Sequence, residues 1–366
     1  MRKKSRQQRS KPHQPARGGV SPQRERSTIW AVAVLEGCQD VARVEINRRL
    51  RGAVEWLSHS RSDEIHLRYE GPPAPLVALR TVQSLFIRRD FAVQRPRTLL
   101  SPEHLEAIAQ CVQKAQHFGG PSAGTRLRFD AAGADSPTMR RLGQALADRL
   151  HMPFDAQEGD CVLALRPGGV GWEVLCRVGN RPLATRAWRK VDYRGSLNAA
   201  LAASMIELSQ PRSADRFVNL MCGGGTLLIE RLHRAPAACA VGCDLSAEAV
   251  AASRENAAAA GVWPHVLRAD ARACGLPTAG FDVVVADLPY GRAHGARSEN
   301  GMLYSYTLAE AARLCRKGGR AVFISEDVSS LRRALLEGQA QWELLDERTM
   351  IQRTFRPRCV TLRRRG

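Results

Sequence analysis

The segment Asp287-Leu-Pro-Tyr-Gly291 is the most specific chemical feature of the sequence, and it follows an apolar run. A strand that ends in Asp and continues into Pro and an aromatic residue makes a stiff turn. Such a turn can aim the Asp287 side-chain oxygen and a backbone carbonyl at one exocyclic amine. The exocyclic amine of a nucleobase is a poor nucleophile because its lone pair is delocalised into the aromatic ring. Two acceptors on its hydrogens favour a tetrahedral nitrogen, while Tyr290 can stack on the base.

A second feature is the glycine-rich segment 219–230, NLMCGGGTLLIE, in which a strand pattern leads into a helix pattern. Glycines let the backbone approach a ligand closely, and the following helix start supplies free N–H groups. A phosphate loop is excluded because no Lys follows the glycines, and Leu228 occupies the position of the third glycine of a dinucleotide fingerprint. A nucleoside-type cofactor without a pyrophosphate remains possible, and a plain structural turn is the alternative.

Acidic residues follow further strand patterns. Asp244 comes 19 residues after Gly225, where a carboxylate can accept hydrogen bonds from both ribose hydroxyls. Asp270 follows the next strand pattern and could accept from an adenine amino group. Each acid alone is as well explained as a surface residue or a helix cap. Polar groups after successive strands point instead to one site, because open α/β sheets bind ligands at the carboxyl ends of their strands.

Strands alternate with helices after residue 215, which predicts a mostly parallel sheet. The expected strands are Phe217–Met221, Cys239–Asp244, His265–Arg268, Phe281–Ala286, Ala321–Ser325, Trp342–Leu345 and Cys359–Leu362. The expected helices are Leu227–His233, Ala247–Ala259 and Thr307–Arg316, the last capped by Gly318-Gly319.

The N-terminal part has a different predicted order of elements from the part after residue 215. The pattern of residues 28–100 predicts the order β-α-β-β-α-β of the ferredoxin-like plan. Its expected elements are Ile29–Leu35, Asp40–Leu50, Ala53–Leu57, Ile65–Tyr69, Pro75–Val82 and Leu85–Val93. The elements expected after it are a helix at Pro102–Phe118, a strand at Thr125–Asp130, a helix at Thr138–Leu150 and a hairpin of Cys161–Leu165 with Trp172–Val178. The basic stretch Arg181–Lys190 then reads as a solvated edge strand or as a nucleic-acid contact.

The composition favours a polyanionic partner. The chain of 366 residues contains 55 Lys and Arg residues and 36 Asp and Glu residues, which gives a net charge of +19. Since nearly all of the basic residues are Arg, genome composition competes with function as the cause. Residues 1–27 hold nine of the basic residues and almost no apolar ones, which predicts a disordered basic arm and no signal peptide.

Other function classes are disfavoured by simple counts. No run approaches the roughly 18 apolar residues of a membrane span, so we expect a soluble protein without a membrane partner. The ten cysteines form no C-x-x-C pair, and no His pair has metal-ligand spacing. We therefore expect reduced thiols, no metal and a cytoplasmic location. The oligomeric state is not encoded in any motif, and a monomer is presumed.

Residues 215–330 resemble the class I S-adenosylmethionine-dependent methyltransferases of the THUMP-associated RNA guanine-N2 group. Asn219–Glu230 is similar to that group's Asp-Pro-Met-Cys-Gly-Ser-Gly-Thr turn, and Asp287–Gly291 to its Asp/Asn-Pro/Leu-Pro-Tyr/Phe-Gly turn. Tyr193–Leu197 resembles the segment before its catalytic domain. Residues 125–190 are weakly similar to a THUMP domain, and 28–100 to the ferredoxin-like domain before it. The sequence departs from the pattern at Asn219, where Asp is usual, and at Gly224, where Ser is usual.

The resemblance implies an α/β fold. A Rossmann-like class I methyltransferase domain, built on a mostly parallel seven-stranded sheet, would follow α+β ferredoxin-like and THUMP-like domains. The implied division is a disordered basic tail at 1–27, a ferredoxin-like domain at 28–100, a THUMP-like RNA-binding domain with a linker helix at 101–190, and the methyltransferase domain at 191–366.

The resemblance also implies transfer of a methyl group from S-adenosylmethionine to the N2 amine of a guanosine in RNA, with tRNA as the first expectation. The implied catalytic residues are Asp287, Leu288, Pro289 and Tyr290. The implied cofactor-binding residues are Asn219, Cys222, Gly223, Gly225, Thr226, Asp244, Leu245, Asp270 and Ala271. We expect Arg186, Arg189, Lys190 and Arg292 to bind the RNA.

Three alternatives stay open. The same turn type would serve guanine N2 of ribosomal RNA or adenine N6. A cytosine C5 mechanism is disfavoured because positions 288–291 offer no nucleophilic Cys. A non-catalytic RNA-binding protein with a decayed methyltransferase domain is favoured only by Asn219.

Overall fold

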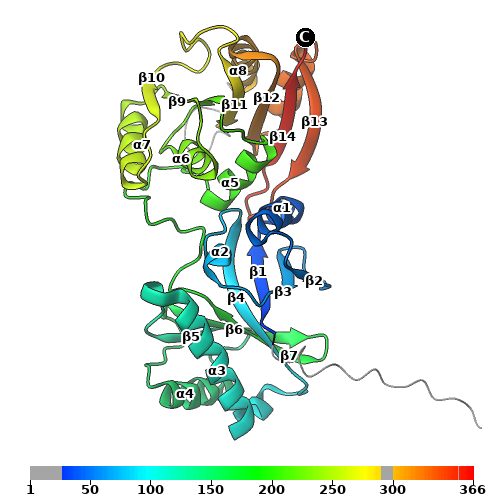
Figure 1. Ribbon diagram of the computed structural model, residues 1–366, viewed down its shortest axis with the longest axis vertical. Coiled ribbons are helices and arrows are strands. Elements are labelled where there is room, and N and C mark those ends of the chain that lie inside the picture. Colours follow the sequence, from blue (N-terminus) through cyan, green and yellow to red (C-terminus); the bar gives the residue numbers. More distant parts are fainter. Residues whose placement is uncertain (1–26, 290–299, 353) are drawn as a thin grey trace, which may run out of the picture.

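The computed structural model describes residues 27–289, 300–352 and 354–366. The described chain forms two seven-stranded sheets that lie one beyond the other along the long axis of the molecule (Figure 1). No helix within these three ranges is both long enough and apolar enough to cross a membrane.

The N-terminal sheet has the strand order β2-β3-β1-β4-β7-β6-β5. Its strands are β1 (Ile29–Val34), β2 (Glu55–Leu57), β3 (Glu64–Arg68), β4 (Val82–Phe91), β5 (Leu127–Asp130), β6 (Cys161–Gly168) and β7 (Gly171–Arg177). Its helices are α1 (Gln39–Leu50), α2 (Ala74–Val77), α3 (Pro102–Gly119) and α4 (Pro137–Leu150). The order β2-β3-β1-β4 is that of the ferredoxin-like plan. Because β4 also pairs antiparallel with β7, one sheet runs through both of the units that the sequence predicts here.

The C-terminal sheet has the order β10-β9-β8-β11-β12-β14-β13. Its strands are β8 (Arg216–Leu220), β9 (Cys239–Asp244), β10 (His265–Arg268), β11 (Phe281–Asp287), β12 (Cys315–Ser325), β13 (Trp342–Thr349) and β14 (Arg358–Arg364). Its helices are α5 (Ala199–Leu208), α6 (Thr226–Arg234), α7 (Ala247–Ala259), α8 (Asn300–Leu314) and α9 (Val328–Glu337). The first five strands in this order are parallel and β14 is antiparallel, which confirms the mostly parallel seven-stranded sheet.

Burial on both faces explains why the central strands are continuous apolar runs. Val283, Val284 and Val285 of β11 are each fully buried, as expected for a parallel strand covered by helices on both sides. The successive strands therefore end at one edge of the sheet, which is where the expected site residues lie.

Four sequence expectations are wrong in detail. The helix expected at Thr307–Arg316 ends at Leu314, and Gly318-Gly319 lie inside β12 instead of capping a helix. The helix expected at Pro75–Val82 is the single turn α2, because the chain enters β4 at Val82. The helix α9 was not expected, although Asp327 caps it by accepting from the Ser330 N–H at 3.1 Å. The stretch 181–190 contains no strand.

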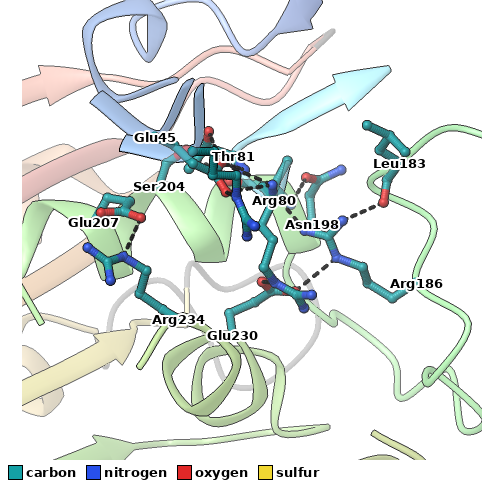
Figure 2. A network of polar contacts seen from close by, with 12 residues as sticks. Glu45, Arg80, Thr81, Leu183, Arg186, Asn198, Ser204, Glu207, Glu230 and Arg234 are labelled. Atoms are coloured by element: carbon teal, nitrogen blue, oxygen red, sulfur yellow. Dashed lines mark hydrogen bonds and ion pairs between the residues drawn. The ribbon is translucent and has the colours of Figure 1, made fainter. Parts of the chain in front are cut away.

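Buried ion pairs join the two sheets (Figure 2). The Glu230 carboxylate on α6 accepts from Arg80, which precedes β4, and from Arg186 in the chain between the sheets. Nearby, Glu207 on α5 accepts from Arg48 on α1 and from Arg234. Since α6 also carries part of the cavity described below, these contacts fix the N-terminal sheet relative to it.

Candidate functional site

A cavity of about 530 Å³ opens at the carboxyl ends of β8, β9, β10 and β11. Its lining is drawn from the segment before α5, the glycine turn, and the segments that follow β9, β10 and β11. The lining residues that the sequence analysis expected are Cys222, Gly223, Thr226, Asp244, Leu245, Asp270, Ala271, Asp287, Leu288 and Pro289. The volume lies in the ordinary range for a small-molecule or cofactor site.

The glycine turn has a backbone that few side chains tolerate. Met221, Gly223 and Gly225 have φ of +53°, +51° and +83°, and α6 begins directly after them. A residue with a Cβ would be strained at Gly225, where it would also meet Ser253. The turn therefore presents its backbone to the cavity, as the sequence predicts, at the start of a helix.

Asp244 ties the glycine turn to the next helix. Its Oδ2 accepts from the Gly223 N–H at 2.9 Å, and its Oδ1 accepts from the Ser246 N–H at 3.0 Å. An ionised carboxylate offers about four acceptor positions, so Asp244 retains capacity for a ligand's hydroxyl groups. The two backbone bonds hold the carboxylate in place before any ligand arrives.

Asp270 is paired with Arg272, which also lines the cavity. The Arg272 Nη2 lies 2.6 Å from Asp270 Oδ2, and the Arg272 N–H lies 2.9 Å from Oδ1. The hydrogen bonds from the Arg272 side chain hold the pKa of Asp270 below its usual range. Arg272 thus keeps this carboxylate charged at the cavity wall.

Asp287 is the unusual carboxylate of the site. Its Oδ1 is buried and has no hydrogen-bond partner, although the residue lines the cavity. Burial raises the pKa of Asp287 from 3.8 to about 7. An orphaned buried acceptor is costly, and such groups concentrate at functional sites.

The residues after Asp287 are held by their own backbone groups. The Leu288 N–H donates to the Ile324 carbonyl at 2.9 Å, and the Pro289 carbonyl accepts from the Tyr304 hydroxyl at 2.5 Å. Within the described residues, no hydrogen bond reaches the Leu288 carbonyl. The turn therefore combines two unoccupied acceptors, Asp287 Oδ1 and the Leu288 carbonyl. Tyr290, the stacking residue expected from the sequence, lies outside the described residues.

Two expected cofactor residues do not line the cavity. Gly225 lies just behind it in the turn, and Asn219 is fully buried within the sheet. The Asn219 Nδ2 donates to the carbonyls of Leu220 at 3.0 Å and Val285 at 3.3 Å. Asn219 therefore bonds β8 to β11. Because its side chain does not line the cavity, having Asn here in place of Asp does not alter the set of carboxylates that line the cavity.

The expected RNA-binding residues have different surroundings. Arg186 donates to Glu230 and to the carbonyls of Leu183 and Arg80, so its guanidinium faces protein and is not available to a phosphate. Arg189 donates to the Leu197 carbonyl and to Thr226 Oγ1, beside the cavity.

Of the two remaining expected RNA-binding residues, the structure describes only Lys190. Lys190 is exposed. Arg292 lies outside the described residues. Of the four, only Lys190 is thus seen with its side chain open to solvent.

Several lining residues were not expected from the sequence, among them Tyr193, Ser196, Ser246, Arg272 and Leu303. Tyr193 and Ser196 reach the cavity from the segment before α5. Their only signal was the similarity of residues 193–197 to the segment that precedes the catalytic domain in the family.

Neither metal nor thiol chemistry is indicated at the site. Among the residues that the structure describes, no three His, Cys, Asp or Glu side chains are grouped to hold a metal ion. Burial raises the pKa of the Cys222 thiol to about 12, so this lining residue is protonated and a weak nucleophile at neutral pH.

Comparison with known proteins agrees with this geometry. Residues 186–354 match the family model described as RMKL-like, methyltransferase domain. This segment is similar to the methyltransferase domain of that family, and it is called the methyltransferase domain below. The matched segment contains the whole cavity lining, including Asp287 and Leu288.

Relatives and solved structures extend the likeness. The chain is 30% identical over 203 residues to the tRNA (guanine(6)-N2)-methyltransferase of Thermus thermophilus. The aligned region covers 55% of this chain and 60% of that protein. The chain is 32% identical to the mouse tRNA (guanine(6)-N(2))-methyltransferase THUMP3 over 40% of this chain and 32% of that protein. The match therefore spans less than two thirds of either relative.

The crystal structure of TrmN from Thermus thermophilus has the same fold, with a TM-score of 0.74 over 92% of this chain and 99% of that chain at 22% identity. A possible methylase from Clostridium difficile follows with a TM-score of 0.66 over 93% of this chain and 98% of that chain at 14% identity. Both likenesses include the N-terminal sheet as well as the methyltransferase domain.

Proposed function

We propose that this protein transfers a methyl group from S-adenosylmethionine to the N2 amine of a guanosine in RNA, with tRNA as the substrate. The observation that carries the proposal is the pair of unoccupied acceptors, Asp287 Oδ1 and the Leu288 carbonyl, on one turn that lines the cavity. An exocyclic amine has two hydrogens, and this pair can accept both.

The cavity suits a nucleoside cofactor. Asp244 is preorganised to accept ribose hydroxyls, and Asp270 and Ala271 lie where an adenine could be bound. The glycine turn and the start of α6 would contact the remainder of the cofactor through backbone groups. S-adenosylmethionine supplies an electrophilic methyl group on a sulfonium, so positioning of the acceptor does most of the remaining work.

The turn would prepare the acceptor amine. With both hydrogens bonded to the Asp287 carboxylate and the Leu288 carbonyl, the nitrogen lone pair would be less delocalised into the guanine ring and free to attack a methyl group. Transfer would form an N–C bond while the methyl–sulfur bond breaks with its electron pair on sulfur, and the amine would lose one proton. Asp287 is placed to take that proton, and its raised pKa of about 7 suits a group that must accept a proton at neutral pH.

The substrate class rests on the relatives and on charge. The two relatives quoted above are named as tRNA guanine-N2-methyltransferases, and a third, the bovine THUMPD2, is named as a U6 snRNA guanine-N2-methyltransferase. The net charge of +19 favours a polyanion such as RNA. A cytoplasmic location would follow from a tRNA substrate.

The non-enzymatic alternative loses its only support. It depended on Asn219, which bonds the sheet internally and does not line the cavity. Methylation of adenine N6 and methylation of ribosomal RNA are alternatives that the experiment decides. The turn would bind an exocyclic amine without contacting the rest of the base.

The test combines calorimetry with nucleoside mass spectrometry. The full chain should bind S-adenosylmethionine, and incubation with unmodified tRNA should produce N2-methylguanosine. Formation of N6-methyladenosine, or methylation confined to ribosomal RNA, would redirect the proposal. RNA affinity without any cofactor binding would refute it in favour of a binding protein. Nucleoside analysis of a strain lacking the gene would then locate the target.

A further inference from the structure

A buried tyrosine lies directly beneath the catalytic turn. Tyr304 on α8 has no exposed surface, and its ring packs in the core of the methyltransferase domain. Its hydroxyl lies 2.5 Å from the Pro289 carbonyl oxygen and 2.6 Å from Ser325 Oγ at the end of β12. Ser325 Oγ in turn accepts from the Asp327 N–H at 2.9 Å. Four polar groups from three segments thus form one chain of hydrogen bonds.

The proton direction along this chain is fixed at both ends. A carbonyl oxygen only accepts, so the Tyr304 hydroxyl must donate to Pro289. The Asp327 N–H only donates, so the Ser325 hydroxyl is left to donate to Tyr304. Burial raises the pKa of Tyr304, which keeps the phenol protonated and able to donate. Bonds aligned in one direction polarise and strengthen one another.

We propose that Tyr304 is a positioning residue for the methyl-acceptor site. By engaging the Pro289 carbonyl, it turns that carbonyl into the protein and leaves the Leu288 carbonyl as the backbone acceptor for the substrate amine. The Leu288 N–H is fixed to Ile324 on the same strand that ends in Ser325, so β12 holds Leu288 directly and Pro289 through Tyr304. This inference rests on the proposed function, because it assigns Tyr304 a role in the same reaction.

A tyrosine that only filled the core would not need its hydroxyl. Phenylalanine would supply the same ring, and the buried hydroxyl must be matched by partners to avoid a desolvation cost. Here both partners belong to the structure around the active turn. The variant that separates the two roles is therefore Tyr304→Phe, which keeps the ring and removes the hydroxyl.

The test compares the single-turnover rate of methyl transfer with binding. Tyr304→Phe should lower the rate at saturating RNA and cofactor by about tenfold or more, which corresponds to roughly 1.4 kcal/mol in the barrier. Dissociation constants for S-adenosylmethionine and RNA should stay within twofold of the parent protein. The matched control is Tyr69→Phe, a buried tyrosine of the N-terminal sheet, which should leave the rate unchanged.

A second variant tests whether the chain acts as a unit. Ser325→Ala should lower the rate less than Tyr304→Phe, and the double variant should be no slower than Tyr304→Phe alone, because groups in one chain are not additive. If Tyr304→Phe does not fold, Ser325→Ala serves as the test instead. It should lower the rate of methyl transfer and leave the dissociation constants for S-adenosylmethionine and RNA within twofold of the parent protein.

The outcomes separate this inference from the proposed function. A parent protein that transfers no methyl group refutes the proposed function, and the role of Tyr304 falls with it. An active parent with an unchanged Tyr304→Phe rate refutes the role of Tyr304 alone. A rate loss matched by an equal loss of cofactor affinity, or multiplicative effects in the double variant, also overturns it.

Discussion

Arg80 and Glu230 form an ion pair of 2.6 Å between Nε and Oε2, although the two residues belong to different sheets. The Glu230 side chain is completely buried, and Arg186 occupies its other oxygen at 2.9 Å. Glu230 lies one turn along α6 from Thr226, which lines the cavity. The ion pair therefore anchors the N-terminal sheet to the helix that follows the glycine turn.

Replacing Glu230 by Ala should lower the free energy of unfolding by about 3 kcal/mol, because two guanidinium groups lose their buried partner. Chemical denaturation followed by tryptophan fluorescence would measure this. The control is Glu343→Ala, since Glu343 and Arg363 form an exposed pair at 3.4 Å whose loss should cost roughly 0.5 kcal/mol or less. Equal effects of the two variants would contradict a special role for the buried pair.

Replacing Asp287 by Ala should reduce methyl transfer by at least about 100-fold, because the amine loses its side-chain acceptor. RNA and cofactor affinities should change little, since neither depends on this carboxylate. A rapid-quench assay with labelled cofactor measures the first effect, and filter binding measures the second. Retained turnover would remove Asp287 from the mechanism.

Activity should depend on the charge of Asp287. Burial places the pKa of this carboxyl at about 7, so the fraction of the accepting, ionised form increases as pH rises through 7. The rate of the chemical step should rise over the same range and then level off. A rate that is flat between pH 6 and pH 8, with binding also flat, would show that ionisation of Asp287 is not required.

The same pKa has a consequence for stability. The folded protein binds this proton more tightly than the unfolded chain, whose carboxyl has a pKa of 3.8, so stability is lost as pH rises from about 4 to about 7. Asp287→Asn removes the charge and should be more stable than the parent at pH 8 by up to about 4 kcal/mol. At pH 4 the difference should be small. Thermal unfolding at both pH values would decide.

Replacing Asn219 by Asp should not tighten cofactor binding, although Asp is usual in the family. A carboxylate at this position would face the carbonyls of Leu220 and Val285 that Asn219 now bonds. We expect the free energy of unfolding to fall by roughly 1–3 kcal/mol and the cofactor dissociation constant to stay within about twofold. Calorimetric titration that shows clearly tighter binding would contradict this placement of the side chain.

Removal of residues 1–26 should weaken RNA binding and flatten its dependence on salt. Truncation at this point keeps Ser27, which accepts from Arg68 at 3.2 Å. Each phosphate contact that is lost should reduce the slope of log affinity against log salt by about 1. A full-length variant with the tail's basic residues changed to Gln separates charge from length. An unchanged slope would mean that the tail does not contact RNA.

Much of the active site follows from local sequence. The expected strands Cys239–Asp244 and His265–Arg268 match β9 and β10, because apolar runs bounded by turn residues specify buried strands. Asp244, Asp270 and Asp287 then meet at one cavity, since the carboxyl ends of parallel strands share one edge. The spacing of the sequence therefore predicted that these three carboxylates would lie at one cavity.

Other features could not be read in this way because they depend on contacts between distant segments. Arg186 lies in a basic stretch that suggested RNA, yet its guanidinium bonds to Glu230, which is 44 residues away. Asn219 lies in the cofactor motif, yet its amide points between β8 and β11. A side chain's direction is set by what packs against it, and a local pattern does not contain that information.

The sequence by itself determined the order of the elements, the glycine turn and the Asp-Leu-Pro-Tyr turn, because these depend on short-range backbone preferences and hydrophobic periodicity. Only the tertiary structure decided which acceptors of the turn are unoccupied. The Leu288 carbonyl is left open because Tyr304, 15 residues beyond Pro289, occupies the neighbouring carbonyl. Asp287 Oδ1 is left without a partner because burial excludes water and no donor of the described chain reaches it.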